Sequence, residues 1–119
     1  MKNLVHKDGI QLSVVCTDPT TPASGDPVRV GAMCGVAITA ERTDGTTTVL
    51  FPHGAVVSLS VKGVDGVGNS AVAVGDKLFY VDADTPKVSK KTAGTFIGYA
   101  LEAITSGSTA TIKVKLANA

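Results

Sequence analysis

The sequence predicts an all-β protein: a small, single-domain β-barrel or β-sandwich with little or no helix. The clearest sign is the segment 111–116, in which Ile, Val and Leu alternate with Thr and Lys. A period of two is typical of a strand with one buried and one wet face. Thirteen glycines and five prolines, together with many Val and Thr residues, favour strands and tight turns over helices. No segment sustains a 3.6-residue period, so we expect roughly eight to ten strands of ordinary length.

The composition limits the function as well as the fold. A chain of 119 residues is one domain that buries roughly two-thirds of its unfolded surface. Only 18% of the residues are charged, which indicates that a partner covers part of the surface. A net charge of +1 gives no electrostatic basis for binding nucleic acid or an anionic membrane. Without Trp the core must be mainly aliphatic, and we expect it also to use all five aromatic side chains: Phe51, Phe79, Tyr80, Phe96 and Tyr99.

The chain divides into an N-terminal arm or short edge strand, residues 1–8, and a β-domain, residues 9–119. The arm is polar around Leu4 and Val5 and lacks the continuous apolar segment of a signal peptide, so we expect synthesis in a cytoplasm. No apolar run is long enough to span a membrane. The expected strands of the domain are 10–14, 28–30, 36–39, 46–51, 55–62, 78–81, 96–104 and 111–116.

The connections between these strands carry turn residues. Pro19 and Pro22 have no N–H for a strand ladder, so 17–24 is expected to be a loop. Asp44-Gly45 favours a tight hairpin turn. The sequence Ser-Gly-Ser at 106–108 predicts a flexible turn that makes the last two strands a C-terminal hairpin.

An internal echo links the two halves of the sequence. Gly-Asp pairs at 25–26 and 75–76 each precede a short apolar strand, and Gly-x-Ala sequences at 35–37 and 98–100 follow. Glycine permits the backbone of such a turn, and Asp accepts hydrogen bonds from nearby turn amides. Two such units are expected to close one barrel or sandwich together, although the echo is short for a true repeat.

No group of residues in the sequence predicts a catalytic, cofactor-binding or metal site, so we expect the protein not to be an enzyme. His6 and His53 lie far apart and have no metal-ligand spacing. The glycine-rich segment 63–70 lacks the Lys-Ser/Thr that a phosphate-binding loop needs. Cys16 and Cys34 are expected to be buried thiols, although a disulfide or a metal pair remains open.

Several lysines gather in the C-terminal third of the chain: Lys87, Lys90, Lys91, Lys113 and Lys115. A solvated face is the favoured interpretation, because runs of like charge usually belong to the solvent-exposed surface. The alternative is a contact with an acidic surface of a partner.

A series of short motifs runs in order along most of the chain. The pattern Met-x-Asn-x-Val-x-x-Gly is matched by Met1, Asn3, Val5 and Gly9, with one extra residue before the glycine. Ser-Gly-Asp-Pro-Val stands at 24–28 and Gly-Val-Ala at 35–37. A Thr-rich strand at 46–49 leads to a further strand from Gly54, and Gly-Asp-x-x-Tyr-x-Asp stands at 75–82 with Phe79 as an extra residue. Ile-Gly-x-Ala-x-Glu at 97–102 closes the series. The series resembles the capsid decoration, or cement, proteins of tailed bacteriophages that carry the DUF2190 domain.

The resemblance implies a structural protein of the virion. It implies a β-domain, expected to be a homotrimer, that binds the major capsid protein on the exterior of an expanded capsid and reinforces it. It implies no cofactor and no direct contact with nucleic acid. The alternative from another class is a small β-barrel module that binds nucleic acid or carbohydrate. Such surfaces usually present aromatic platforms and a basic groove, whereas here the charge is balanced and the aromatic side chains are expected in the core.

Two sets of contact residues follow as hypotheses. The N-terminal arm is expected to reach the capsid through four residues: Lys2, Leu4, Val5 and Lys7. The apolar segments around 78–81 and 96–97 are expected to contribute to an oligomer interface through three residues: Phe79, Tyr80 and Phe96.

Overall fold

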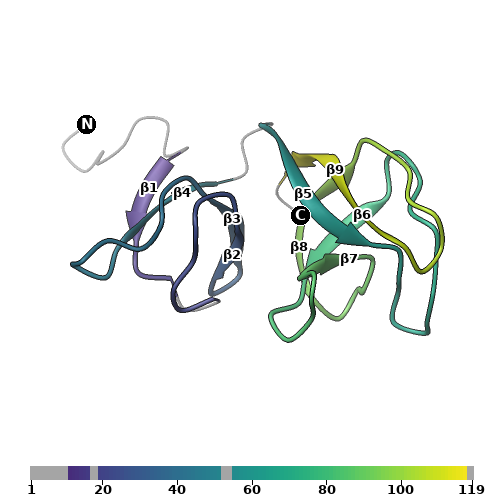
Figure 1. Cartoon of the computed structure of the whole chain (residues 1–119), viewed down its shortest axis with the longest axis horizontal. Helices are drawn as coiled ribbons and strands as arrows, with labels where there is room; N and C mark the ends of the chain where they lie inside the picture. The colour runs from purple at the N-terminus through teal and green to yellow at the C-terminus, as the bar shows by residue number, and fades with distance from the viewer. Residues whose placement is uncertain (1–10, 17–18, 52–54, 118–119) are drawn as a thin grey trace, which may run out of the picture.

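The computed structural model describes residues 11–16, 19–51 and 55–117, and Figure 1 shows them as two β-structures lying side by side. Nine strands and no helix occur within these ranges, which confirms the all-β prediction. One structure is a four-stranded antiparallel sheet, and the other is a closed five-stranded barrel. The sheet is formed by the N-terminal part of the described chain and the barrel by the C-terminal part.

The sheet has the strand order β1-β4-β3-β2, and the closed barrel has the order β5-β7-β6-β8-β9. The strands of the sheet are β1 (Gln11–Val14), β2 (Pro27–Val30), β3 (Met33–Ala37) and β4 (Thr47–Leu50). The strands of the barrel are β5 (Val56–Lys62), β6 (Lys77–Tyr80), β7 (Val88–Ser89), β8 (Thr95–Ala100) and β9 (Thr109–Leu116). All the pairings are antiparallel except that of β5 with β7, which is parallel. Among these strands, β7 alone was not predicted, since two residues are too few to show a period.

The C-terminal hairpin is present, although it is shorter than predicted. β8 and β9 pair over three positions, and β9 makes its longer ladder with β5. The predicted strand 96–104 ends at Ala100. Beyond it the Glu102 carboxylate accepts the Lys113 N–H at 2.8 Å, and Ile104 forms an isolated bridge with Val72. A side-chain acceptor thus takes the place of a backbone partner and ends the ladder.

The two halves contain the same Gly-Asp turn. In the first, Asp26 N–H donates to Ala23 O at 3.1 Å, and Asp26 Oδ2 accepts the Ala23 N–H at 2.9 Å. In the second, Asp76 and Ala73 repeat both bonds at 3.1 and 2.8 Å. The glycine before each aspartate has a positive φ, 89° and 93°, a conformation that favours Gly. The turn chemistry expected from the sequence is therefore confirmed at both places.

The similarity between the halves extends through four strands. β1, β2, β3 and β4 occupy the places in the sheet that β5, β6, β8 and β9 occupy in the barrel. Val28 pairs with Gly35 on β3, as Leu78 pairs with Gly98 on β8. A Cβ atom at Gly35 would lie 2.6 Å from Leu50 O, and one at Gly98 would also collide with the backbone of the next strand. Close contact between strands thus requires glycine at the same point of both halves.

Equivalent positions also form the two cores. The cluster in the sheet consists of Cys16, Val28, Ala37, Val49 and Phe51, with Leu12, Val14 and Val30 packed against it. When the two halves are matched by the pairing of their strands, the five residues of the sheet cluster correspond in order to Val61, Leu78, Ala100, Val114 and Leu116. All five of these counterparts belong to the barrel cluster. The barrel cluster also includes Cys34 and Val36 from β3, so the other face of the sheet packs on the barrel. Cys34 Sγ donates to Thr95 O at 3.7 Å across this contact.

The halves differ in the connection that follows their second strand. β2 turns into β3 through Gly31 and Ala32, whereas β6 reaches β8 through residues 81–94, which include β7. β7 pairs with both β6 and β5 and thereby closes the barrel. The two Gly-Asp units therefore do not close one common barrel, which was one of the two expected arrangements. The second unit closes on itself because its longer connection supplies the closing strand.

Candidate interaction surfaces

Three aromatic rings form a patch on the outside of the barrel. Phe79 on β6 and Phe96 on β8 have ring centroids 5.9 Å apart at an interplanar angle of 66°. Phe96 and Tyr99 are 5.3 Å apart at 72°. Both contacts are edge-to-face, which is a favourable geometry for aromatic pairs. With Lys77 the rings line a small hollow of about 160 Å³, and we call these four residues the aromatic patch.

A β-bulge places these rings on one face. The pairing of β6 with β8 shifts between Leu78 and Phe79, so Leu78 faces Gly98 whereas Phe79 faces Phe96. Strict alternation along β8 would put Phe96 and Tyr99 on opposite faces. Because of this shift, Ile97 has no paired residue on β6, and its side chain is fully buried. The same shift allows the rings of Phe96 and Tyr99 both to face outward. The irregularity falls beside Phe79, the extra residue of the sequence motif.

The remaining aromatic side chains of the described chain point inward. Tyr80 is 1% exposed, and its hydroxyl donates to Asp82 Oδ1 at 2.8 Å. This hydrogen bond is the main cause of the lowered pKa of Asp82. Phe51 belongs to the core of the sheet. The expectation that all five aromatic residues serve the core is therefore wrong for the three in the patch. Of the suggested interface residues, Phe79 and Phe96 face outward, whereas Tyr80 is part of the barrel core.

Three of the clustered lysines are paired with aspartates. The ion pairs are Lys87–Asp82 at 3.4 Å, Lys90–Asp76 at 3.3 Å and Lys91–Asp84 at 2.7 Å. Lys90 Nζ also donates to Ser70 Oγ and Ala71 O. These lysines therefore connect loops at the barrel surface, and their charges are largely compensated. Lys113 and Lys115 are separate from them, on the exposed face of β9.

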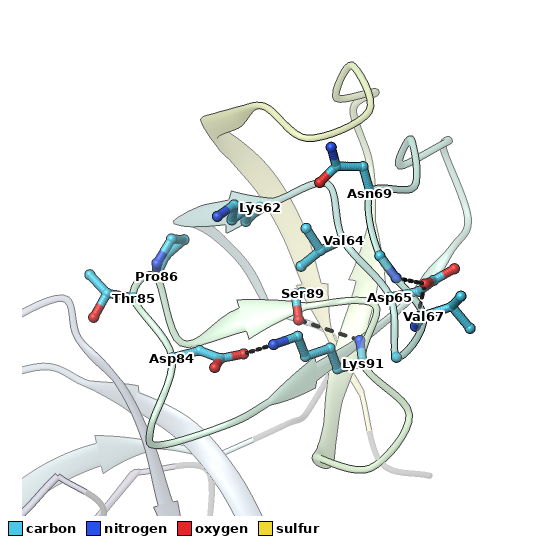
Figure 2. Close-up of a pocket in the computed structure, with 12 residues that line it drawn as sticks. Lys62, Val64, Asp65, Val67, Asn69, Asp84, Thr85, Pro86, Ser89 and Lys91 are labelled. Atoms are coloured by element: carbon cyan, nitrogen blue, oxygen red, sulfur yellow. Dashed lines mark hydrogen bonds and ion pairs between the residues drawn. The ribbon is translucent and has the colours of Figure 1, made fainter.

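The glycine-rich loop borders a hollow of about 340 Å³ on the barrel, which Figure 2 shows. Asp65 Oδ1 accepts the N–H groups of Val67 and Gly68 at 2.8 and 3.0 Å, and these bonds lower the Asp65 pKa. The loop amides thus bind the chain's own carboxylate, a role unlike that of a phosphate-binding loop. Across the hollow, Lys91 points toward Asp84.

The two cysteines are buried, as expected, and lie in different core clusters. Burial raises the pKa of the Cys34 thiol to about 12, and burial also raises the pKa of Cys16. Both thiols are therefore poor nucleophiles at neutral pH. Within the described ranges, no three His, Cys, Asp or Glu residues gather as a possible metal site. A search of the same residues found no helix long and apolar enough to cross a membrane.

Comparison with protein families decides the class of the chain. The family model of phage cement proteins matches residues 6–116. The chain belongs to the phage cement protein family. Comparisons with curated proteins and with solved structures gave no match.

Membership of the cement family gives the protein a structural role in the phage capsid. The protein associates with the capsid and is located in the virion. The four arm residues expected to contact the capsid, Lys2, Leu4, Val5 and Lys7, lie outside the described residues, as do His6 and His53. The sequence reasoning missed Tyr99 as a surface residue, because the bulge beside it is invisible to a search for strict alternation.

Proposed function

We propose that this cement protein binds the outer surface of an expanded phage capsid and reinforces it by linking capsid subunits, without catalysing a reaction. The match of the cement family over residues 6–116 carries this proposal. A protein that binds only the assembled shell stabilises it by mass action, each bound copy adding RT ln(1 + [L]/Kd).

The proposed binding form is a homotrimer. Once one subunit of a trimer has bound, its other two subunits are held close to their own binding sites on the capsid. Three contacts that are each modest therefore combine to give tight binding. The aromatic patch is the proposed surface between copies. Its rings are only partly buried within one chain, and exposed aromatic groups are typical anchors of protein interfaces.

The geometry of the patch supports a protein contact over a nucleic-acid or carbohydrate platform. Neighbouring rings meet at 66° and 72° and are therefore far from coplanar. A stacking platform offers open ring faces to successive bases. Here the face or edge of each ring is already used by its neighbour, and Lys77 is the one cation of the patch.

The N-terminal arm remains the proposed element that reaches the capsid. Lys2 and Lys7 would add about 0–1 kcal/mol each as exposed ion pairs. Leu4 and Val5 would add roughly 1.5–3 kcal/mol each if fully buried. Apolar contact is therefore expected to dominate the binding of the arm.

The test uses expanded capsids of the encoding phage, prepared without this protein. Purified protein is added, binding is measured by co-sedimentation, and the capsids are heated until they release DNA. We expect saturable binding and a higher release temperature. Absence of both effects at protein concentrations in the high micromolar range would reject the cement proposal.

A further inference from the structure

We propose that the outer face of the paired strands β5 and β9 is a docking surface for an acidic surface of a capsid subunit. This face, which we call the lysine face, consists of the outward side chains of the two strands and carries three lysines: Lys62, Lys113 and Lys115. The inference rests on the proposed function and names a surface of the barrel, in addition to the N-terminal arm, that makes the capsid contact.

The pairing of β5 with β9 determines which side chains share this face (Figure 1). The ladder runs over the whole of β5, from Val56 opposite Lys115 to Lys62 opposite Thr109. Because side chains alternate along a strand, every second residue points away from the barrel core. On β9 this outward set includes Lys113 and Lys115, and the residues that flank Lys113 are buried. At about 3.4 Å per residue, the lysines span roughly 20 Å along the strands.

The positive charges of the lysine face are uncompensated within the described residues. No described carboxylate lies within ion-pair distance of the Nζ atoms of its three lysines. The lysines of the nearby loop are different, because Lys87, Lys90 and Lys91 each pair with an aspartate. Glu102 does reach β9, but its carboxylate accepts the backbone N–H of Lys113. Since neither β5 nor β9, both described in full, contains an acidic residue, the face presents positive charge only.

The middle of the lysine face is hydroxyl-rich and borders a hollow of about 380 Å³. Three hydroxyl side chains of the face line this hollow: Ser58, Ser60 and Thr111. Residues 25–27 of the sheet and the loop at 84–87 complete the lining. The carboxylates of Asp26 and Asp84 lie there too, but one accepts the Ala23 N–H and the other pairs with Lys91. Hydroxyl and ammonium donors therefore remain available on the face for the carboxylates of a partner.

A second copy of the chain offers few carboxylates to this face. The six aspartates of the described residues and Glu102 all accept hydrogen bonds or ion pairs from their own chain. They hold turns and loops in place, which leaves Glu41 as the single described carboxylate without such a bond. The net charge of +1 gives no general attraction to nucleic acid. Because the family assigns the capsid as the partner, the acidic surface belongs to a capsid subunit.

The test removes charge from the lysine face and compares it with charge removed elsewhere. Lys113→Gln/Lys115→Gln removes two positive charges, and Lys113→Arg/Lys115→Arg keeps them. Val67→Glu/Val74→Glu lowers the net charge by the same two units outside the face, at valines that are 100% and 66% exposed. All three variants are checked for folding by circular dichroism and titrated against expanded capsids that lack the protein.

We expect the Gln variant to bind about tenfold more weakly than the wild type, because two ion pairs with the capsid are lost. The Arg variant and the valine variant should bind like the wild type. The difference between the Gln variant and the wild type should shrink at about 1 M salt, where the Debye length is about 3 Å. Equal binding of the Gln and Arg variants, or equal weakening of the Gln and valine variants, would overturn the lysine face and leave the cement function standing. A wild-type protein that does not bind capsids would overturn both.

Cross-linking identifies the partner of the face directly. A carbodiimide joins a lysine amine to a carboxylate in contact with it, and mass spectrometry of the capsid-bound wild-type protein locates the joined residues. We expect Lys113 or Lys115 to be joined to Asp or Glu residues of a capsid subunit. Cross-links from these lysines only to a second copy would overturn the capsid assignment. A Gln variant that binds capsids normally but loses binding to a DNA oligonucleotide would assign the face to nucleic acid and overturn it as well.

Discussion

Replacing Phe96 by Ala is the sharpest test of the aromatic patch as the surface between copies. Phe96 is the central ring, in edge-to-face contact with both Phe79 and Tyr99. Each such pair is worth about 0.5–1.5 kcal/mol, so the substitution should lower the free energy of unfolding of one chain by roughly 1–3 kcal/mol. This loss occurs whether or not the protein self-associates.

The effect on assembly is separate and adds up over the copies of the oligomer. Complete burial of a Phe side chain contributes about 1.5–3 kcal/mol, and Phe96 is already partly buried within the chain. We therefore assign about 1 kcal/mol per copy to the interface, or about 3 kcal/mol for a trimer. Because 1.4 kcal/mol corresponds to a factor of ten, the dissociation constant of the trimer should rise roughly a hundredfold.

Analytical ultracentrifugation over a range of concentrations measures this shift, and urea denaturation measures the stability of the chain. Val67→Ser is the control, because Val67 is 100% exposed at the tip of the glycine-rich loop and lies outside the patch. We expect it to change neither quantity by a measurable amount. If Phe96→Ala is folded and its association equals that of the wild type and of the control, the patch is not the surface between copies.

Three further predictions concern the arm, the turns and the close strand contacts. Deletion of residues 1–8 should leave the β-domain folded but weaken capsid binding and lower the temperature of DNA release; equal protection by both forms would reject the arm as a contact. The pKa of Asp76 is lowered, mainly by the hydrogen bond that its carboxylate accepts from Ala73 N–H. The ionised carboxylate therefore stabilises the fold above its ordinary pKa of 3.8, and this stabilisation is lost as the pH falls through the lower pKa of the folded protein. Asp76→Asn should therefore flatten the fall of the unfolding free energy in acid, measured by denaturation at several pH values, and an unchanged slope would contradict this assignment. Gly98→Ala should strongly lower the melting temperature because its Cβ would meet the backbone of β9, whereas Gly66→Ala, with open space around it, should not; equal melting temperatures would show that the strands yield.

Local chemistry made a large part of the fold predictable from the sequence. The alternation at 111–116 correctly identified β9, because period-two burial is a property of one strand. The Gly-Asp pairs correctly located two equivalent turns, because each turn is held by bonds within a few residues. The order of the short motifs along the chain indicated the cement family, and the family match over residues 6–116 confirms it.

The tertiary structure alone decided how these parts combine. The two Gly-Asp units form separate structures because 81–94 is long enough to return β7 to β5, a pairing between distant segments that no local pattern encodes. The bulge at Leu78 and Phe79 gathers three rings on the surface because strand register depends on both partners. Among the described residues, the first unit is a four-stranded sheet that does not close, whereas the second unit is a closed barrel. This difference could be read only from the pairing of all the described strands, because closure depends on contacts between segments far apart in the sequence.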